Sequence, residues 1–122
     1  DVELAGPPTF ARADHVLLAQ ILQNLVINGA HAARSLPAPR VRFHTYMHEG
    51  RAIISVRDNG PGIAPELHQK IFEPFFTTRR GRGGTGLGLA LCREYALQMG
   101  AEVTLWSVPG RGACFRVAFN PA

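Results

Sequence analysis

The sequence predicts an α+β sandwich in which two long helices pack against several antiparallel strands. Two segments repeat apolar residues at helical spacing, and four shorter segments alternate apolar and polar residues between turn residues. The chain has 122 residues, of which 46% are hydrophobic, so residues 1–122 form a single domain that can bury a core without disulfides or metal. Two helices packed on antiparallel strands, with no internal repeat in the sequence, are typical of the α+β class.

The elements are expected in the following order. Residues 1–13 are predicted to form a short strand, a proline turn and a second short strand. Asp14 is the expected N-cap of a helix from Val16 to Ala33. The apolar residues of this helix fall on one side: Leu18, Ile21, Leu22, Leu25 and Val26.

Two hairpins are predicted farther along the chain. Residues 40–48 and 52–58 form the first hairpin around Glu49-Gly50, and residues 102–108 and 113–119 form the second. The segment from Gly60 to Gly84 is mostly loop, with a short helical patch at 65–72. A second long helix covers 87–99 and ends at Gly100.

Composition excludes several classes of protein. The apolar fraction excludes a disordered chain, no stretch approaches the ~18 uncharged apolar residues of a bilayer span, and no signal peptide opens the sequence. The net charge of +4 raises nucleic acid as a partner, but the arginines are scattered. We therefore expect neither nucleic-acid nor membrane contact by this domain. Cys92 and Cys114 lie in apolar surroundings, which indicates reduced thiols in a reducing compartment.

The polar side of the first helix is unusual. Gln20, Asn24, Asn28 and His31 share one face at helical spacing, and no formally charged residue occurs between positions 20 and 33. Asn is a poor helix former, and Gly29 beside it permits close approach. A plain polar surface is the alternative interpretation. Two Asn one turn apart favour a stripe that faces a ligand, and an amide oxygen suits Mg²⁺.

DNGPGI at 58–63 is the second segment whose residues suggest a binding role. By the period of two, Asp58 points to the same side as the apolar residues of its strand, where a carboxylate needs a donor. The exocyclic amine of an adenine could supply that donor, and its ring could lie over Gly60 and Gly62. An ordinary Asp-Asn-Gly turn at the end of a hairpin is the alternative.

Two further segments follow. Phe72, Phe75 and Phe76 stand beside the Gly-rich stretch and could anchor a lid loop, or form a satellite of the core. GRGGTGLGL at 81–89 leads into the second helix, where backbone N–H groups and the helix N-terminus favour phosphate.

In this order, the four segments resemble the catalytic and ATP-binding domain of bacterial two-component sensor histidine kinases. These belong to a superfamily shared with gyrase-type ATPases and the Hsp90 chaperone. QILQNLVINGAHAA is similar to the asparagine box of the family, DNGPGI to its first glycine box, FEPFFTT to its phenylalanine box and GTGLGL to its second glycine box. The resemblance extends from about Asp14 to Phe119, and FEPFFTT looks most like the nitrogen-regulation and dicarboxylate-sensing subfamilies.

The resemblance implies a Bergerat-type fold, with a mixed, mostly antiparallel sheet covered by helices on one face and an ATP lid loop. It implies that Asn28 coordinates Mg²⁺, that Asn24 lies near the phosphates and shares the catalytic role, and that Asp58 takes the adenine amine. The nucleotide-binding residues that it implies are completed by His31, Gly60, Gly62, Ile63, Phe72, Gly84, Thr85, Gly86, Leu87 and Gly88.

Some positions depart from the family pattern. Gly29 replaces a usual Ala, which should only loosen the helix, and His31 stands where many members carry Lys or Arg. Ala113 replaces a Thr that often supports a water on the adenine. The water-hydrolysing relatives carry a Glu one turn before the metal-binding Asn, whereas this chain has Asn24. Without that base, transfer to water should be inefficient, which favours a kinase over an ATPase.

The resemblance therefore implies a protein histidine kinase that uses ATP and Mg²⁺. The acceptor histidine would lie on a separate dimerisation domain, through which the kinase forms a homodimer, and a response regulator would act downstream. The domain would be cytoplasmic, within a parent that could be anchored in the inner membrane. His48 beside Glu49 mimics an acceptor pair but is expected to be a solvated turn residue. A superfamily ATPase and a non-catalytic ATP-binding module remain the alternatives. The lid arginines Arg79, Arg80 and Arg82 could contact the nucleotide phosphates, or they could be exposed only to solvent.

Overall fold

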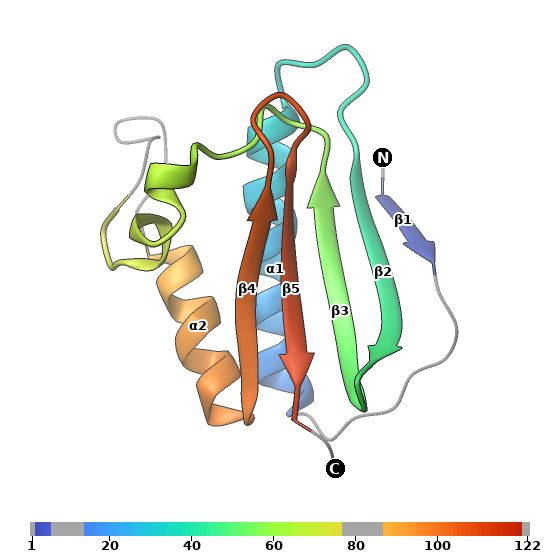
Figure 1. The fold of residues 1–122 in the computed structure, drawn as a ribbon, viewed down its shortest axis with the longest axis vertical. Coiled ribbons are helices and arrows are strands. Elements are labelled where there is room, and N and C mark those ends of the chain that lie inside the picture. The colour runs from blue at the N-terminus through green and yellow to red at the C-terminus, as the bar shows by residue number, and fades with distance from the viewer. Residues whose placement is uncertain (1, 6–13, 77–86, 121–122) are drawn as a thin grey trace.

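The computed structural model describes residues 2–5, 14–76 and 87–120. It shows a five-stranded sheet in the order β1-β2-β3-β5-β4, with both long helices on one face (Figure 1). The strands are β1 Val2–Ala5, β2 Val41–His48, β3 Arg51–Asp58, β4 Ala101–Ser107 and β5 Ala113–Phe119. The helices are α1 His15–Ala33 and α2 Gly88–Gln98, with two short 3₁₀ helices, η1 Pro65–Leu67 and η2 Lys70–Phe72. The predicted α+β class and one-sided helix cover are confirmed.

The sheet is mixed, as predicted. β1 runs parallel to β2, with Val2 opposite Val41, and all other neighbouring pairs are antiparallel. Both predicted hairpins form, and the first turns through Glu49 and Gly50, whose φ angles are 52° and 76°. The second strand predicted for residues 1–13 and the lid loop at 77–86 lie outside the described residues.

Local sequence signals place the helix ends. The Asp14 carboxylate accepts hydrogen bonds from the N–H groups of Val16 and Leu17, so the predicted N-cap is confirmed. α2 ends at Gln98 with Met99 as its C-cap, and Gly100 follows with φ 68°, the left-handed conformation that a glycine adopts readily after a helix. The predicted helical patch at 65–72 consists of the two short 3₁₀ turns η1 and η2.

The core lies between the sheet and the two helices. α1 contributes a buried stripe at four-residue spacing, and β5 contributes Phe115 and Val117. The α1 stripe consists of Ile21, Leu25, Gly29 and Ala33. The expectation that no stretch approaches a bilayer span is wrong for α1, which is long and apolar enough to cross a membrane. Core helices of other domains share these properties, and the buried stripe of α1 packs inside this domain.

Gly29 corrects one expectation. It belongs to the buried stripe, and not to the ligand-facing side that Asn28 suggested. A Cβ on Gly29 would lie 3.2 Å from Cγ2 of Val41 and 3.3 Å from Cβ of Asp58. The glycine therefore lets α1 approach β2 and β3 closely, and its effect is more specific than a loosened helix.

Among the described residues, no helix lies on the other side of the sheet (Figure 1). We call the side chains of β2–β5 that point to this side the open face. Strand register assigns these residues to it: Arg42, His44, Tyr46, His48, Arg51, Ile53, Ser55, Arg57, Glu102, Thr104, Trp106, Cys114, Arg116 and Ala118. Its smaller central side chains are buried although they lie outside the main core cluster: Ile53, Cys114 and Ala118. Longer side chains around them therefore provide the cover.

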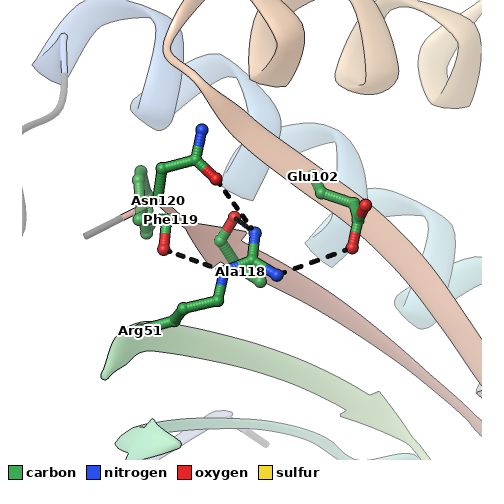
Figure 2. Close-up of polar contacts among 5 residues, drawn as sticks. All are labelled: Arg51, Glu102, Ala118, Phe119 and Asn120. Carbon is green, nitrogen blue, oxygen red and sulfur yellow. Dashed lines mark hydrogen bonds and ion pairs between the residues drawn. The ribbon is translucent and has the colours of Figure 1, made fainter. Parts of the chain in front are cut away.

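Arg51 fastens the end of β5 to the start of β3 (Figure 2). Its guanidinium donates to the carbonyl oxygens of Phe119 at 3.2 Å and Ala118 at 3.1 Å, and to Oδ1 of Asn120 at 3.4 Å. Nη1 lies 3.8 Å from Oε1 of Glu102. Arg51 thus satisfies carbonyl groups at the end of β5.

Candidate functional site

Asp58 is the buried carboxylate that the alternation of β3 predicted. It is only 4% exposed, and its Oδ1 accepts hydrogen bonds from the N–H groups of Gly60 at 2.8 Å and Ala113 at 3.4 Å. Burial raises the pKa of the Asp58 carboxyl above its ordinary value, while these two donors and the Arg57 guanidinium oppose the rise. The carboxylate is held in one orientation by backbone groups from two separate segments.

Glycines surround Asp58 where the chain approaches itself most closely. A Cβ on Gly60 would lie 2.7 Å from the carbonyl oxygen of Ala32, at the end of α1. Gly62 has φ 81°, and a Cβ there would lie 2.6 Å from the carbonyl oxygen of Val108. A Cβ on Gly112, which has φ 87°, would overlap the carbonyl oxygen of Asp58. Larger residues are excluded at all three positions, so the backbone forms this part of the site.

Ser107 joins the DNGPGI turn to the β4–β5 hairpin, and sequence reasoning missed it. Its hydroxyl accepts a hydrogen bond from the N–H of Ile63 at 2.7 Å and donates one to the carbonyl oxygen of Gly112 at 3.0 Å. The N–H of Gly110 also donates to the carbonyl oxygen of Pro61 at 2.6 Å. No local pattern could indicate the contact between the turn and the hairpin, because Ile63 and Ser107 lie 44 residues apart in the sequence.

Asn59 fixes the other side of the same turn. Its side-chain oxygen accepts from the N–H of Arg40 at 2.8 Å, and its amide nitrogen donates to the carbonyl oxygen of Ala38 at 2.9 Å. The loop between α1 and β2 is therefore tied to the end of β3. The Asn in the sequence DNG signals a turn, but its partners could not be deduced.

The polar face of α1 divides into two parts. Asn24, Asn28 and His31 are half-buried, whereas Gln20 is exposed. Ala32, one residue after His31, lies against Gly60, so the last turns of α1 lie beside the Asp58 turn. Asn28 and His31 therefore belong to the part of α1 nearest the buried carboxylate.

Asn24 lies at the contact between α1 and α2. A Cβ on Gly88, the first residue of α2, would be 3.8 Å from Oδ1 of Asn24. The buried Cys92 thiol donates to the carbonyl oxygen of Ile21, with 3.7 Å between sulfur and oxygen. Burial raises the pKa of Cys92 to about 12, and a hydrogen bond with the Asn24 side chain opposes this rise. The structure thus brings Asn24 to the start of the helix that follows the Gly-rich segment.

The phenylalanine segment packs into the core. Phe72 is 5% exposed, meets Phe115 edge-on at 6.1 Å between ring centroids, and has the Arg93 guanidinium 4.2 Å above its ring. Phe76 also packs against the core, whereas Phe75 has φ 66° and is 63% exposed. Phe72 therefore belongs to the main core and not to a satellite of it, and Phe76 packs against that core.

Other predicted site residues are placed as follows. Ile63 is half-buried beside Ser107, and Leu87 is the residue that precedes α2. Gly84, Thr85 and Gly86, with the arginines of the lid segment, lie outside the described residues. His48 ends β2 at the exposed turn, with Nε2 3.7 Å from Oε1 of Glu49.

This arrangement suits a purine nucleotide. The buried Asp58 carboxylate is an acceptor for an amine, and two half-buried Asn amides follow on α1. The glycines beside Asp58 allow the chain to pack closely on itself, because a Cβ on each of them would meet protein backbone. Within the described ranges, no group of three His, Cys, Asp or Glu could hold a metal ion. The side chain present for a hard cation is an Asn amide, which fits Mg²⁺ shared with phosphate and water.

Comparisons with known proteins agree with this geometry. Residues 13–122 match the family described as Histidine kinase-, DNA gyrase B-, and HSP90-like ATPase. The chain is 42% identical over 103 residues to the signal transduction histidine-protein kinase AtoS of Escherichia coli, covering 84% of this chain and 16% of AtoS. Curated relatives are matched over 15% to 26% of their lengths.

Solved structures share the fold. Full-length ShkA in complex with AMPPNP matches with a TM-score of 0.81 and 33% identity, over 97% of this chain and 25% of ShkA. The catalytic domain of histidine kinase ThkA matches with a TM-score of 0.81 and 30% identity, over 98% of this chain and 78% of the ThkA domain. The predicted resemblance to the catalytic domain of sensor histidine kinases is confirmed, and the chain belongs to the family of histidine kinase-, gyrase B- and HSP90-like ATPases.

Proposed function

We propose that this domain binds Mg-ATP and donates the γ-phosphoryl group to a histidine on a separate dimerisation domain of a sensor histidine kinase. The observation that carries the proposal is the buried Asp58 carboxylate, fixed at Oδ1 by two backbone N–H groups and bordered by glycines. A buried carboxylate of this kind can accept a hydrogen bond from the adenine amine. A guanine presents a carbonyl oxygen at that position and would be rejected.

The amide residues of α1 would serve the triphosphate end. Asn28 would supply an oxygen to Mg²⁺, which when bound neutralises phosphate charge and positions the transferred group. Asn24, beside the start of α2, would lie near the phosphates with Leu87 and Gly88, and His31 would add a hydrogen bond. Gly84, Thr85 and Gly86 complete the proposed phosphate-binding segment.

Asn24 also favours kinase over hydrolase chemistry. An amide cannot take a proton from water, and the neighbouring Cys92 thiol, whose pKa is raised to about 12, is no better as a base at neutral pH. A histidine imidazole supplied by another domain is itself a nucleophile and needs less activation than water. The expected partners are therefore a phospho-accepting dimerisation domain, which also makes the homodimer, and a response regulator that receives the phosphoryl group.

This function places the domain in the cytoplasm, where ATP is available, and leaves membrane attachment to other parts of the parent. The similarity of FEPFFTT to nitrogen-regulation and dicarboxylate sensors remains an interpretation of that motif. The extent of the domain, residues 1–122, also remains a proposal.

A phosphotransfer assay tests the function directly. ATP labelled at the γ-phosphate is mixed with this domain and a separate helical-hairpin domain that bears a phospho-accepting histidine. Label on the hairpin supports a kinase. Free phosphate would indicate an ATPase, and bound ATP without either product would indicate a binding module.

Nucleotide binding is tested separately by calorimetry. The variant Asp58→Ala is expected to weaken ATP binding by about 100-fold while leaving weak GTP binding nearly unchanged, because one buried hydrogen bond to the base is lost. Asn28→Ala is expected to remove the dependence of binding on Mg²⁺. Glu102→Gln on the open face is the matched control. Equal losses for ATP and GTP in Asp58→Ala would contradict the assigned role of Asp58.

A further inference from the structure

The open face has a positive charge that the proposed nucleotide site does not use. Arg57 on β3 and Arg116 on β5 are exposed there, and Arg42 stands opposite Arg57 in the strand register. On β2–β5, the acidic side chain of the open face is Glu102, and its carboxylate already lies 3.8 Å from the Arg51 guanidinium. Arg42 also has Glu3 of β1 as a register partner, so the positive charge that an anionic partner would complement is that of Arg57 and Arg116.

An exposed aromatic ring lies next to these arginines. Trp106 on β4 is 45% exposed, and the Arg57 guanidinium lies 5.6 Å from its ring centroid. Both residues are register partners of Cys114, one on each side, so they meet above this buried thiol. Thr104, the register partner of Arg116, is also exposed. Charge and apolar area therefore lie side by side on β3, β5 and β4, as in the residues that anchor many protein interfaces.

We propose that the open face is a docking surface for an acidic protein segment that also carries an apolar side chain. Carboxylates of the segment would pair with Arg57 and Arg116, and the apolar side chain would cover the ring of Trp106. Arg is suited to this use because its planar guanidinium binds carboxylates in a bidentate manner and stacks on rings. The occupant is an acidic segment of a separate partner protein.

The arrangement of rings favours a peptide over a nucleic acid. Single strands bind to sheets through successive rings on which successive bases stack. Here the ring of Tyr46 is half-buried, is separated from β4 by β3 and β5, and meets His44 edge-on at 5.2 Å between centroids. Trp106 therefore offers one apolar contact among arginines, which fits one anchoring side chain of a peptide.

This surface is separate from the nucleotide site. Arg57 and Asp58 are adjacent in β3, so their side chains point to opposite faces of the sheet. A segment bound to the open face would thus leave the proposed ATP site accessible. The two proposals can fail independently, because one concerns Asp58 and the other concerns Arg57, Arg116 and Trp106.

Tryptophan emission tests the proposal, because Trp106 is the single tryptophan of the chain. The probe is a twelve-residue peptide in which Asp and Glu alternate with Leu and which contains no aromatic residue. Titration is expected to give a saturable blue shift that weakens with added NaCl, because exposed charges are screened. Arg116→Glu is expected to weaken binding about tenfold, since attraction becomes repulsion.

Lys70→Glu is the matched control, because it makes the same charge change at an exposed residue away from the open face, the first residue of η2. It should alter peptide affinity by less than about twofold, and both variants should bind Mg-ATP like the unchanged protein. If Arg116→Glu does not fold, Thr104→Glu at the neighbouring strand position replaces it and should weaken peptide binding similarly.

Several results would overturn the proposal. These are the absence of a saturable shift, an equal loss in Lys70→Glu, and a peptide of alternating Lys and Leu that binds as well as the acidic one. Tighter binding of oligothymidylate or of phosphatidylglycerol vesicles, with loss in Arg116→Glu, would assign the face to a nucleic acid or a membrane instead.

Discussion

The two faces of the same sheet differ in almost every property that decides function. On the helix-covered face, β3 and β5 present apolar side chains to α1 and α2, and β3 ends there in the buried Asp58. On the open face, the same strands alternate small buried residues with exposed arginines. Residues adjacent in sequence thus serve different purposes. The covered face contributes most of the core and ends in the buried Asp58, whereas the exposed side chains of the open face lie outside the core.

The largest expected effect contrasts two adjacent residues of β5. Phe115 is 2% exposed on the covered face, so Phe115→Ala should lower the free energy of unfolding by about 3–5 kcal/mol through the cavity it leaves. Arg116→Ala on the open face should change it by less than about 0.5 kcal/mol. Urea unfolding of both variants measures the contrast. Similar losses in the two would mean that the open face is packed more firmly than its exposure indicates.

A smaller effect is expected where the open face takes part in structure. Arg51→Met removes three hydrogen bonds to the end of β5, and should lower the free energy of unfolding by about 1–2 kcal/mol. Glu102→Gln removes only the ion pair with Arg51 and should change it by less than about 0.5 kcal/mol. If Glu102→Gln were as destabilising as Arg51→Met, the ion pair and not the carbonyl contacts would hold the strand end.

The third effect concerns the pH dependence of stability. Burial raises the pKa of Asp58 in the folded protein above its ordinary value of 3.8. The folded state therefore holds the proton more tightly than the unfolded chain. The contribution of this group to stability is fully present below the unfolded pKa and is lost as pH rises through the folded pKa.

Asp58→Asn cannot titrate, and its side-chain oxygen can still accept from Gly60 and Ala113. Its stability relative to the unchanged protein should increase as pH rises from about 3.5 to about 7, while its preference for ATP is lost. Urea unfolding across this range measures the difference, with Glu66→Gln, an exposed carboxylate, as the control. Parallel curves for Asp58→Asn and the unchanged protein would contradict the raised pKa.

Much of the fold could be predicted because its signals are local. The N-cap at Asp14, both hairpins and the inward direction of Asp58 follow from spacing within a few residues. The contacts that complete the site are not local. Ser107 meets Ile63 at a separation of 44 residues, and Ala113 meets Asp58 at a separation of 55. Such pairs depend on how the hairpins pack, which periodicity cannot specify.

Gly29 shows the same limit within a helix. Its neighbour Asn28 suggested a close approach by a ligand, but the stripe of α1 at four-residue spacing turns Gly29 toward Val41 and Asp58. The interpretation that Gly29 permits close approach was correct. The expectation that a ligand approaches it was wrong, because Val41 and Asp58 do so. A glycine in a helix indicates a close contact, but only the packing of the other elements shows which group makes it.

The two cysteines have a practical consequence. Cys92 is 0% exposed with a pKa raised to about 12, and Cys114 is 7% exposed beneath Arg57 and Trp106. Thiolate is the reactive species toward maleimides, and access is limited at both positions. A cysteine introduced on the surface should therefore be labelled selectively in the native protein. Fluorophore pairs could then follow movements of this domain relative to its partners without first removing the natural cysteines.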